Sequence, residues 1–476
     1  MGVKKNVIYS TFLTGANYIF PLITFPYVSR ILGPDSLGEN EYALRIVNYF
    51  LLFASLGIAS VGTREIARTK ENRIDCEVAF SSILMLNLLS TLLILALYFI
   101  SILFFAPFER IRPLLLIGSI QLVFSPFLIE WLYKGMEDFP YITKRTLAIR
   151  ILYVISIFIF VRKASDLSIY FTLTILSTIL NAIFNWGYKR KYVSFHFKGL
   201  SLKKYLKPYL TFGLYALLTS MYISFNVVFL GIVSSDLEVG YYSAATKLFS
   251  VILAFFTSFS AVMMPRISNM LEKNEYESAK DIIYKSFELL YPVSLSLILI
   301  GELYAPQIIT ILSGSGYEGA ITPFRIILPL ILIIGTEQIL IVQILTPMRK
   351  DKAILINSIV GSVFGLGLNL LLVPHLACTG SAIVWLSSEL AVFTSAFIFV
   401  SKAVGNVIPV RLFAKNIVLI AIPMLICFAL HTININSYIE MTLGILIILP
   451  MTFIFQTIFL KNKVLTSILG TLKKHR

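Results

Sequence analysis

Cysteine and histidine are scarce in this chain of 476 residues, which contains three cysteines and four histidines. Neither set shows the paired spacing of a disulfide framework or a zinc knuckle, so we expect no metal site. Cys76, Cys378 and Cys427 fall in separate segments, where we expect them to pack in the interior. The sequence also lacks a Walker motif, so we expect it to use no ATP and no other cofactor.

Charged residues are sparse as well. Only 14% of the residues are charged and 57% are hydrophobic, with a mean hydropathy of +0.85. An average soluble domain is about half apolar and a quarter charged. A water-soluble core could not bury so many apolar side chains. The composition therefore excludes a soluble protein and predicts an all-α membrane protein.

About fourteen stretches are long and apolar enough to span a bilayer, because a spanning helix needs about 20 apolar residues. The first of them contains Pro21 and Pro26 and has no small-residue cleavage site, so we expect it to remain as a helix. In the first half the stretches lie at 8–31, 40–59, 78–105, 112–133, 142–161, 168–188 and 208–232. In the second half they lie at 240–264, 284–305, 321–345, 354–373, 378–400, 412–431 and 438–460.

The predicted loops divide the basic residues unevenly. If Met1 is cytoplasmic, about thirty basic residues face inward, as the positive-inside rule requires. Only Arg110, Arg112, Arg162 and Lys163 face outward. We therefore expect both termini to be cytoplasmic. The basic residues behind the net charge of +15 flank the spans and form no basic face on a folded module, which argues against nucleic-acid binding. We expect these basic residues to contact the headgroups of anionic lipids.

The loops leave no room for an extracytoplasmic catalytic domain. The longest predicted outer loop runs for only about fifteen residues between two spans of the usual length, around Tyr304 to Ala320. We therefore expect a protein that is not an enzyme, and a membrane polymerase has no place for its catalytic residues. The inner loops around 62–77 and 265–285 have apolar residues at helical spacing. This spacing predicts amphipathic helices on the inner membrane surface, with a solvated linker as the alternative. In the second loop the stripe comprises Ile267, Met270, Leu271, Ala279, Ile282 and Ile283.

Three chemically special positions recur at an offset of 202 residues, which suggests that the chain consists of two related halves. Gly38 corresponds to Gly240, Arg45 to Lys247, and Arg64 to Arg266. Both halves start on the same side of the membrane, which indicates a parallel repeat about an axis normal to it. We predict an N-terminal lobe of six helices at 1–200, a C-terminal lobe at 201–402, and two further helices with a basic tail at 403–476. Arg45 and Lys247 would then face each other across the pseudo-twofold axis.

Charged residues inside the spans are the candidate site. A basic residue at a helix centre costs about 2.5–3.5 kcal/mol, so it normally faces a wet cavity or a partner. Arg45 and Lys247 lie deepest, whereas Arg30, Arg150 and Arg325 lie near helix ends, from which they could instead reach the headgroups. A cationic cavity favours an anionic substrate such as a phosphate. Glu130, Glu337 and Glu389 could bind a coupling ion or could neutralise the basic residues in structural pairs.

Several runs resemble the Wzx-type polysaccharide flippases of the multidrug/oligosaccharidyl-lipid/polysaccharide exporter superfamily. The opening run FPYVSRILGPDSLG over 25–38 is followed by YA at 42–43, ASLGIA at 54–59 and REIA at 64–67. Further along, the runs are EWLYKGMEDF at 130–139, LSGSGYEGA at 312–320 and GSAI at 380–383. The resemblance covers the first twelve predicted helices in order.

This resemblance implies a substrate and a mechanism. It implies two six-helix lobes around a cationic cavity that moves undecaprenyl-diphosphate-linked oligosaccharide from the cytoplasmic to the outer leaflet of the bacterial cytoplasmic membrane. Alternating access coupled to a proton or sodium gradient is implied too, and the polysaccharide polymerase machinery would be a partner. Two alternatives remain open, a lipid II flippase and a cation-coupled multidrug exporter. The latter would favour acidic over basic cavity residues.

Overall fold

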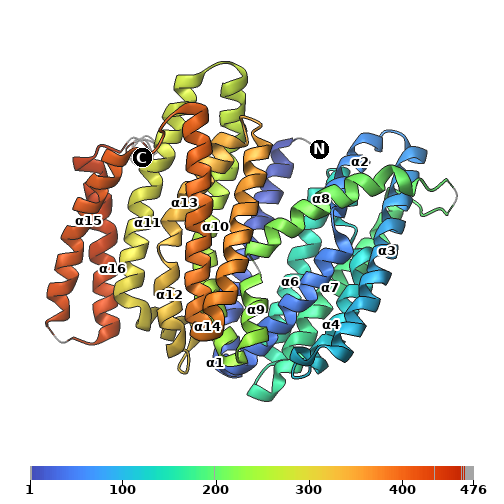
Figure 1. The fold of residues 1–476 in the computed structure, drawn as a ribbon, viewed down its shortest axis with the longest axis horizontal. Coiled ribbons are helices and arrows are strands. Elements are labelled where there is room, and N and C mark those ends of the chain that lie inside the picture. Colours follow the sequence, from blue (N-terminus) through green and yellow to red (C-terminus); the bar gives the residue numbers. More distant parts are fainter. Residues whose placement is uncertain are drawn as a thin grey trace. The chain divides into compact units, whose positions relative to one another are not determined.

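The computed structural model describes residues 3–197, 199–223, 225–433, 435–462, 464 and 466. These residues form helices joined by short turns, and none of them lies in a β-strand (Figure 1). Contacts between helices divide the chain into two compact units, Met1–Ser243 and Ala244–Arg476. The predicted all-α fold class is confirmed.

In the first unit, α1 (Val3–Ser55) consists of two arms joined at a sharp bend. Gly33 has a φ of +74°, a backbone conformation that favours glycine. Pro34 follows directly, and a proline disfavours helical backbone at the residue before it. The bend therefore separates the first two predicted spans, 8–31 and 40–59.

A short amphipathic helix, α2 (Ile58–Thr69), follows the second arm of α1. Its buried side chains, among them Val61 and Ile66, face α3 (Arg73–Phe104) and α5 (Glu130–Gly135), which α2 contacts. Beyond α2, Lys70 pairs with Glu137 at 2.7 Å, and this hydrogen bond lowers the pKa of the Glu137 carboxyl. The amphipathic helix predicted near 62–77 is thus confirmed as a helix, but it begins at Ile58 and ends at Thr69, and its place on the membrane surface stays a prediction.

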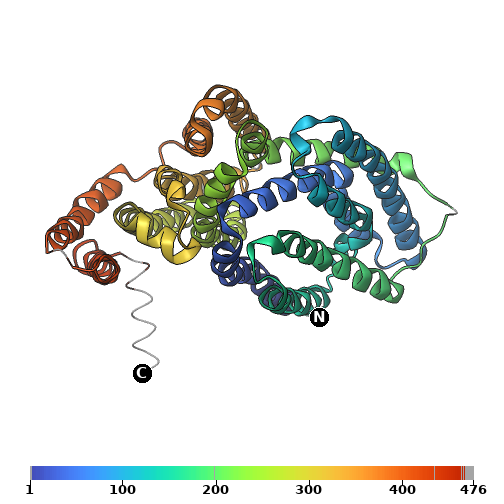
Figure 2. The same cartoon turned by 90° about the horizontal axis from the view of Figure 1, so that it is seen from below.

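The remaining helices of the first unit pack around α1. Both α4 (Arg112–Phe124) and α6 (Phe139–Phe160) contact α1 and α7 (Leu167–Tyr188) (Figure 2). Between α4 and α5, the turn η2 (Ser125–Leu128) contains Pro126 and interrupts the span. The shorter turns are η1 (Ala106–Phe108), η3 (Ala164–Asp166) and η4 (Lys189–Lys191). The unit ends with α8 (Leu202–Ile223), α9 (Phe225–Val233) and the first residues of α10 (Asp236–Glu272).

The second unit continues from α10 with long, often bent helices. In α11 (Tyr276–Ser313), Tyr304 departs from helical geometry, and in α14 (Asp351–Val404), Ala377 has a φ of +45°. The bend at Ala377 separates the predicted spans 354–373 and 378–400. The other elements are η5 (Glu318–Ala320), α12 (Ile321–Ile327), α13 (Leu330–Glu337), η6 (Gln338–Leu345), α15 (Val410–His431), α16 (Ser437–Ile454) and η7 (Phe455–Phe459).

The helical arms of the described residues match the fourteen predicted spans one for one. Nine helical segments among the described residues are long and apolar enough to span a membrane by length and composition, or ten if the bent pair Phe20–Ser55 and Ile58–Thr69 counts as one span. The spans predicted at 142–161 and 208–232 correspond to α6 and to α8 with α9. Here α6 carries three basic residues, Lys144, Arg145 and Arg150.

Two loop predictions in the second half are wrong. No separate surface helix and no solvated linker covers 265–285, because α10 runs to Glu272 and α11 begins at Tyr276. The apolar stripe combines the ends of two long helices, and it is apolar because residues such as Ile267 and Ala279 are buried there. The outer loop near 304–320 is also shorter than predicted, since α11 continues to Ser313.

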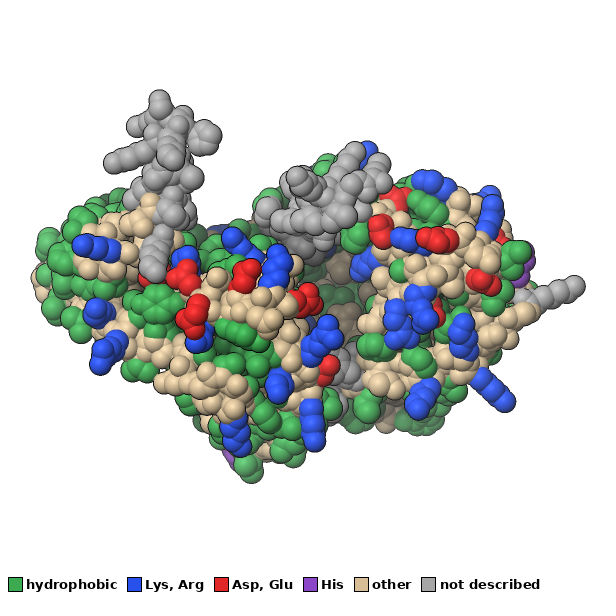
Figure 3. Space-filling view, turned by 90° about the horizontal axis from the view of Figure 1, so that it is seen from above, with side chains coloured by type: hydrophobic (Ala, Val, Ile, Leu, Met, Phe, Trp, Pro, Cys, Tyr) green, Lys and Arg blue, Asp and Glu red, His purple; other side chains and the backbone are tan. Residues whose placement is uncertain are grey.

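One end of the first unit carries many basic side chains. It is formed by α2, the turn between α5 and α6, and η4, and Figure 3 shows lysine and arginine gathered on this face. Arg68, Lys134 and Lys191 are exposed there. The lobe boundaries at 200 and 402 stay a prediction, because grouping by contacts does not test a sequence repeat.

Candidate functional site

Arg45 lies half-buried on the second arm of α1, next to the buried residues Ile46 and Val47. Among the described residues, no carboxylate lies within ion-pair distance of its guanidinium group. One turn further along, the Tyr49 hydroxyl donates to the backbone carbonyl of Ser220 at 3.1 Å and ties α1 to α8. A cation in a span without an acidic partner normally faces water, backbone carbonyls or an anionic ligand.

Arg30 and Arg150, also in the first unit, are held in other ways. Arg30 is exposed on the first arm of α1 and donates to the backbone carbonyl of Pro26 at 2.6 Å. Arg150 is half-buried on α6, with its guanidinium carbon 5.9 Å from the centre of the Phe20 ring. Neither contact is an ion pair with a carboxylate, so both side chains remain secondary candidates for an anion.

Arg145 is a buried basic residue that is not among the predicted site residues. Its side chain is only 4% exposed, and it donates to the Glu130 carboxylate at 2.7 Å and to the amide oxygen of Asn185. Lys134 lies 3.8 Å from the other oxygen of Glu130. Glu130 therefore neutralises basic residues within the first unit, which is the structural alternative considered for the acids.

In the second unit, Lys247 is half-buried on α10, and Arg325 lies on α12. The Arg325 guanidinium lies 3.9 Å from the Glu302 carboxylate, and both side chains are more than 40% exposed. Arg325 therefore has an acidic neighbour, and this neighbour weakens its case as an anion-binding residue. The predicted juxtaposition of Lys247 with Arg45 involves both units and stays a prediction.

Glu337 and Glu389 form a buried pair in the second unit. Glu337 ends α13 and Glu389 lies on α14, and their carboxyl groups are within hydrogen-bonding reach of each other. They are 5% and 6% exposed. The Trp385 indole N–H donates to Glu389 at 3.0 Å, whereas one oxygen of Glu337 has no hydrogen-bond partner among the described residues. Two acidic side chains this close in an apolar interior repel each other when both are charged, so the pair is suited to hold a proton or a cation.

At the end of the first unit away from α2, α1 and α10 cross in direct backbone contact. A Cβ on Gly38 would overlap the carbonyl of Asp236, and a Cβ on Gly240 would overlap the carbonyl of Pro34. Both glycines are therefore required for the approach. The contact is reciprocal at the offset of 202 residues, since Pro34 corresponds to Asp236 and Gly38 to Gly240, and this supports the predicted repeat.

Arg110 forms polar contacts beside the same crossing of α1 and α10. Its guanidinium lies 3.0 Å from the Asp236 carboxylate and donates to the backbone carbonyls of Gly231 at 2.5 Å and Ser234 at 3.2 Å. It also lies over the Tyr42 ring, 5.1 Å from its centre. One side chain thus joins the loop before α4 to the corner between α9 and α10.

The described residues contain no group of three or more His, Cys, Asp or Glu side chains that could hold a metal ion. The three cysteines, all in the described part of the chain, are buried and form no disulfide.

Comparison with known proteins decides the family. A model of the family described as "Polysaccharide biosynthesis protein" matches residues 3–271, which is more than half of the chain. This chain belongs to that family. The match confirms the resemblance to Wzx-type polysaccharide flippases, and a second family model, described as MatE, matches residues 212–371.

Two curated relatives carry the name "Putative O-antigen transporter". The relative from Escherichia coli (strain K12) is 25% identical over 413 residues, which is 84% of this chain and 97% of the relative. The relative from Shigella dysenteriae is 29% identical over 412 residues, which is 84% of this chain and 100% of the relative. This chain is therefore similar to them along almost their whole length.

Solved structures share the fold of this family member. The inward closed conformation of the lipid II flippase MurJ has a TM-score of 0.75 and 17% identity, covering 96% of this chain and 99% of MurJ. An inward-facing multidrug resistance MATE family transporter of the MOP superfamily has a TM-score of 0.65 and 18% identity, covering 81% and 93%. The chain is thus a multi-pass membrane protein with the helical fold of these transporters.

Sequence reasoning found the acidic pair as separate residues but not their contact, because α13 and α14 meet only in the folded unit. It missed Arg145 because Lys144 and Arg145 together look like the end of a cytoplasmic loop. The one available signal was the nearby Glu130, whose position in a span suggested a basic partner.

Proposed function

We propose that this protein flips undecaprenyl-diphosphate-linked oligosaccharide from the cytoplasmic to the outer leaflet for surface polysaccharide biosynthesis, without covalent chemistry. Family membership and the O-antigen transporter names of its relatives support the class of substrate. The observation that carries the proposal is Arg45, a half-buried cation inside a span with no acid within ion-pair distance among the described residues.

The physical chemistry of the substrate fits this cation. A diphosphate and its sugars cannot cross about 30 Å of hydrocarbon unaided, whereas a polyprenyl tail can stay in lipid throughout. Guanidinium and ammonium groups hold phosphate by charge-assisted hydrogen bonds. We assign the diphosphate to Arg45 and Lys247, with Arg30 and Arg150 as secondary contacts. Arg325 has the weakest case because Glu302 lies beside it.

Coupling to an ion gradient would use Glu337 and Glu389. This buried pair has a carboxylate oxygen without a hydrogen-bond partner among the described residues, and it needs a proton or a sodium ion to offset like charge. Glu130 is less suited to this role because Arg145 and Lys134 already neutralise it. Protonation or ion binding at the pair would shift the balance between inward-open and outward-open states.

The crossing of α1 and α10 would close the outer end while the substrate loads from the cytoplasm. Gly38 and Gly240 permit backbone contact there, and Arg110 fastens the corner before α10 to the loop before α4. Opening to the outside would separate these contacts. A single arginine is a modest barrier, because partly exposed ion pairs contribute only about 0–1 kcal/mol.

The positive-inside rule would place the basic end of the first unit, with α2 and η4, in the cytoplasm, and both termini with it. The membrane would be the bacterial cytoplasmic membrane, where anionic headgroups meet the basic loops. Polysaccharide polymerase machinery is the partner expected to receive the flipped repeat unit.

Lipid II transport is the second candidate, because the fold of the lipid II flippase MurJ covers 96% of this chain. Lipid II is also a polyprenyl-linked diphosphate, so the same cations would serve. A multidrug exporter is less favoured, since Arg45 is basic and cationic drugs favour acidic cavities.

Deleting the gene in the host tests the proposal. A membrane-impermeant sugar label should show lipid-linked oligosaccharide accumulating on the cytoplasmic leaflet, and the intact gene should restore outward exposure. Normal exposure after deletion would reject the polysaccharide flippase. Failure to expose lipid II alone would instead support the second candidate.

A further inference from the structure

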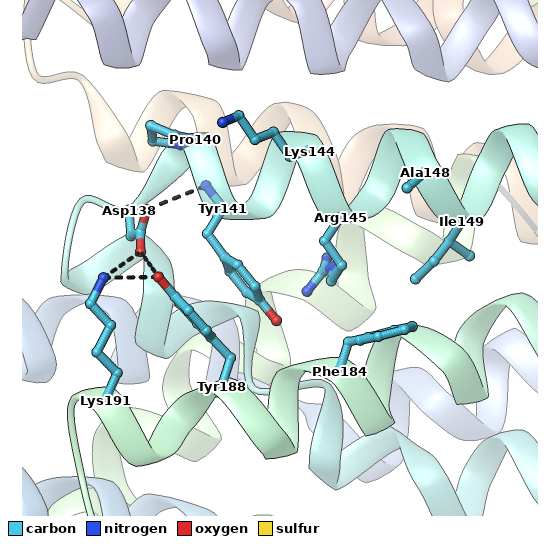
Figure 4. Close-up of a pocket in the computed structure, with 10 residues that line it drawn as sticks. All are labelled: Asp138, Pro140, Tyr141, Lys144, Arg145, Ala148, Ile149, Phe184, Tyr188 and Lys191. Atoms are coloured by element: carbon cyan, nitrogen blue, oxygen red, sulfur yellow. Dashed lines mark hydrogen bonds and ion pairs between the residues drawn. The ribbon is translucent and has the colours of Figure 1, made fainter.

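A separate basic cavity of about 550 Å³ lies against α6 and α7 at the basic end of the first unit (Figure 4). Lys144, Arg145 and Lys191 line it together with the apolar residues Ile149 and Phe184. We propose that this cavity binds the phosphate group of a membrane lipid, whose tail lies along the apolar surface of α6 and α7. The proposal does not depend on what the protein transports.

Asp138 is the acidic residue that lines the cavity, and its carboxylate already accepts hydrogen bonds from within the protein. Its carboxylate caps α6 by accepting the Tyr141 backbone N–H at 3.3 Å, and it accepts the hydroxyls of Tyr188 at 3.1 Å and Tyr192 at 2.6 Å. Burial raises the pKa of Tyr192, and the hydrogen bond to Asp138 raises it further, so this hydroxyl remains a donor. Lys191 lies 3.9 Å from the same carboxylate. Internal donors therefore offset the negative charge.

The basic side chains remain available to an anion. Lys144 is exposed at the rim and has no ion-pair partner among the described residues. Lys191 donates to the Tyr188 hydroxyl at 2.9 Å and is 56% exposed. The Arg145 side chain is only 4% exposed by contrast, and its Nε has no hydrogen-bond partner among the described residues although Glu130 offsets its charge. With the N-terminus of α6 beside them, these donors suit a phosphate.

Exposed apolar side chains continue from the cavity along both helices. On α6, Ile151 and Ile155 are 51% and 50% exposed, and on α7, Ile183 and Phe184 are 54% and 55% exposed. A soluble anion would use only the charged end of this surface, whereas a lipid uses both parts. A bulk anionic phospholipid and a polyprenyl diphosphate share the required chemistry, a phosphate on an apolar chain.

Native mass spectrometry of the full-length protein in detergent tests the site. The probes are phosphatidylglycerol, phosphatidylcholine and undecaprenyl diphosphate, each with and without excess inorganic phosphate. The test variant is Lys144→Gln with Lys191→Gln, and the matched control is Arg190→Gln with Lys203→Gln. The control removes the same charge from exposed positions that do not line the cavity.

We expect the test variant to bind one anionic lipid at least about tenfold more weakly than the wild type and the control. Phosphatidylcholine binding should not distinguish the variants. Loss for phosphatidylglycerol identifies bulk anionic lipid, and loss for undecaprenyl diphosphate alone identifies the polyprenyl carrier. Equal binding by all variants, or displacement of the lipid by inorganic phosphate, would overturn the proposal. If the double variant does not fold, Lys144→Gln alone must show the weakening.

Discussion

Arg45 and Arg145 are two arginines in the spans of the same unit, and they differ in their partners. Arg145 is almost fully buried and donates to Glu130 at 2.7 Å and to Asn185. Arg45 is half-buried and has no acid within ion-pair distance among the described residues. An arginine paired with an acid holds its helices in one arrangement. An arginine without a counter-ion can instead gain its electrostatic stabilisation by binding an anionic ligand. Whether a buried charge has an acidic partner therefore distinguishes a structural residue from a functional one better than its depth in the membrane does.

The largest expected effect comes from removing the unneutralised charge. Arg45→Ala should reduce transport of the lipid-linked oligosaccharide by about 10–100-fold, because a hydrogen bond to a charged group contributes about 1.5–3 kcal/mol. Membrane level and thermal stability should stay normal, since no ion pair is broken. Arg45→Lys should restore part of the activity. A stability loss in Arg45→Ala would place this residue with Arg145 and remove the contrast.

Neutralising the acidic pair should remove ion coupling. Glu389→Gln would let the two side chains share a hydrogen bond without an ion, so transport should stop responding to an imposed proton or sodium gradient. Transport in vesicles with each gradient imposed separately measures this response and identifies the ion. Gln343→Leu, which changes a different buried polar residue of the second unit, should keep the response. Unchanged gradient dependence in Glu389→Gln would leave the acids with a structural role only.

Breaking the ion pair of Arg145 and Glu130 should lower the stability of the protein more than its transport activity. Arg145→Leu leaves Glu130 without its closest cation and should cost roughly 1.5–3 kcal/mol in the free energy of unfolding. Thermal unfolding in detergent would measure it, with Lys203→Gln as the control. Arg145→Leu with Glu130→Gln should lose less than the sum of the two single variants. Additive losses would show that the pair does not interact.

At the crossing of α1 and α10, a prediction can be made that depends on packing and not on charge. Gly38→Ala places a methyl group against the Asp236 carbonyl and should cost about 1–3 kcal/mol, as overpacking does. Gly367→Ala is the matched control, because a Cβ there meets nothing within 4 Å. Lower protein yield and lower melting temperature are expected for the first variant alone. Equal behaviour of the two would mean that the helices do not touch at Gly38.

Arg110 should give the smallest effect. Arg110→Gln removes the pair with Asp236, but both side chains are partly exposed, so the change in stability should stay within about 1 kcal/mol. Transport should change by less than about fivefold. Arg110→Cys with Ser234→Cys, joined by a cleavable thiol-reactive linker about as long as an arginine side chain, should instead block transport until the linker is cleaved. Full transport by the crosslinked protein would show that positions 110 and 234 need not move apart during transport.

Much of the fold could be predicted because apolar stretches of span length leave few alternatives. The sequence predicted all the helical arms but placed helix ends poorly at 265–285 and 304–320, where α10 and α11 extend beyond their apolar segments. Charge patterns alone could not separate Arg45 from Arg145, because the distinction depends on the approach of α5 to α6. The Glu337 and Glu389 contact was equally hidden, since it joins residues 52 positions apart.

The most direct test of the account uses purified protein in vesicles that contain a fluorescent polyprenyl-diphosphate oligosaccharide, with reagent added outside to quench the exposed label. The account predicts rapid exposure of the inner-leaflet label with wild-type protein, similar exposure with Lys203→Gln, and a loss of about 10–100-fold with Arg45→Ala. Equal rates for wild-type protein and Arg45→Ala would contradict the role of the unneutralised cation. No exposure above protein-free vesicles, with wild-type protein shown to be folded, would contradict flipping itself.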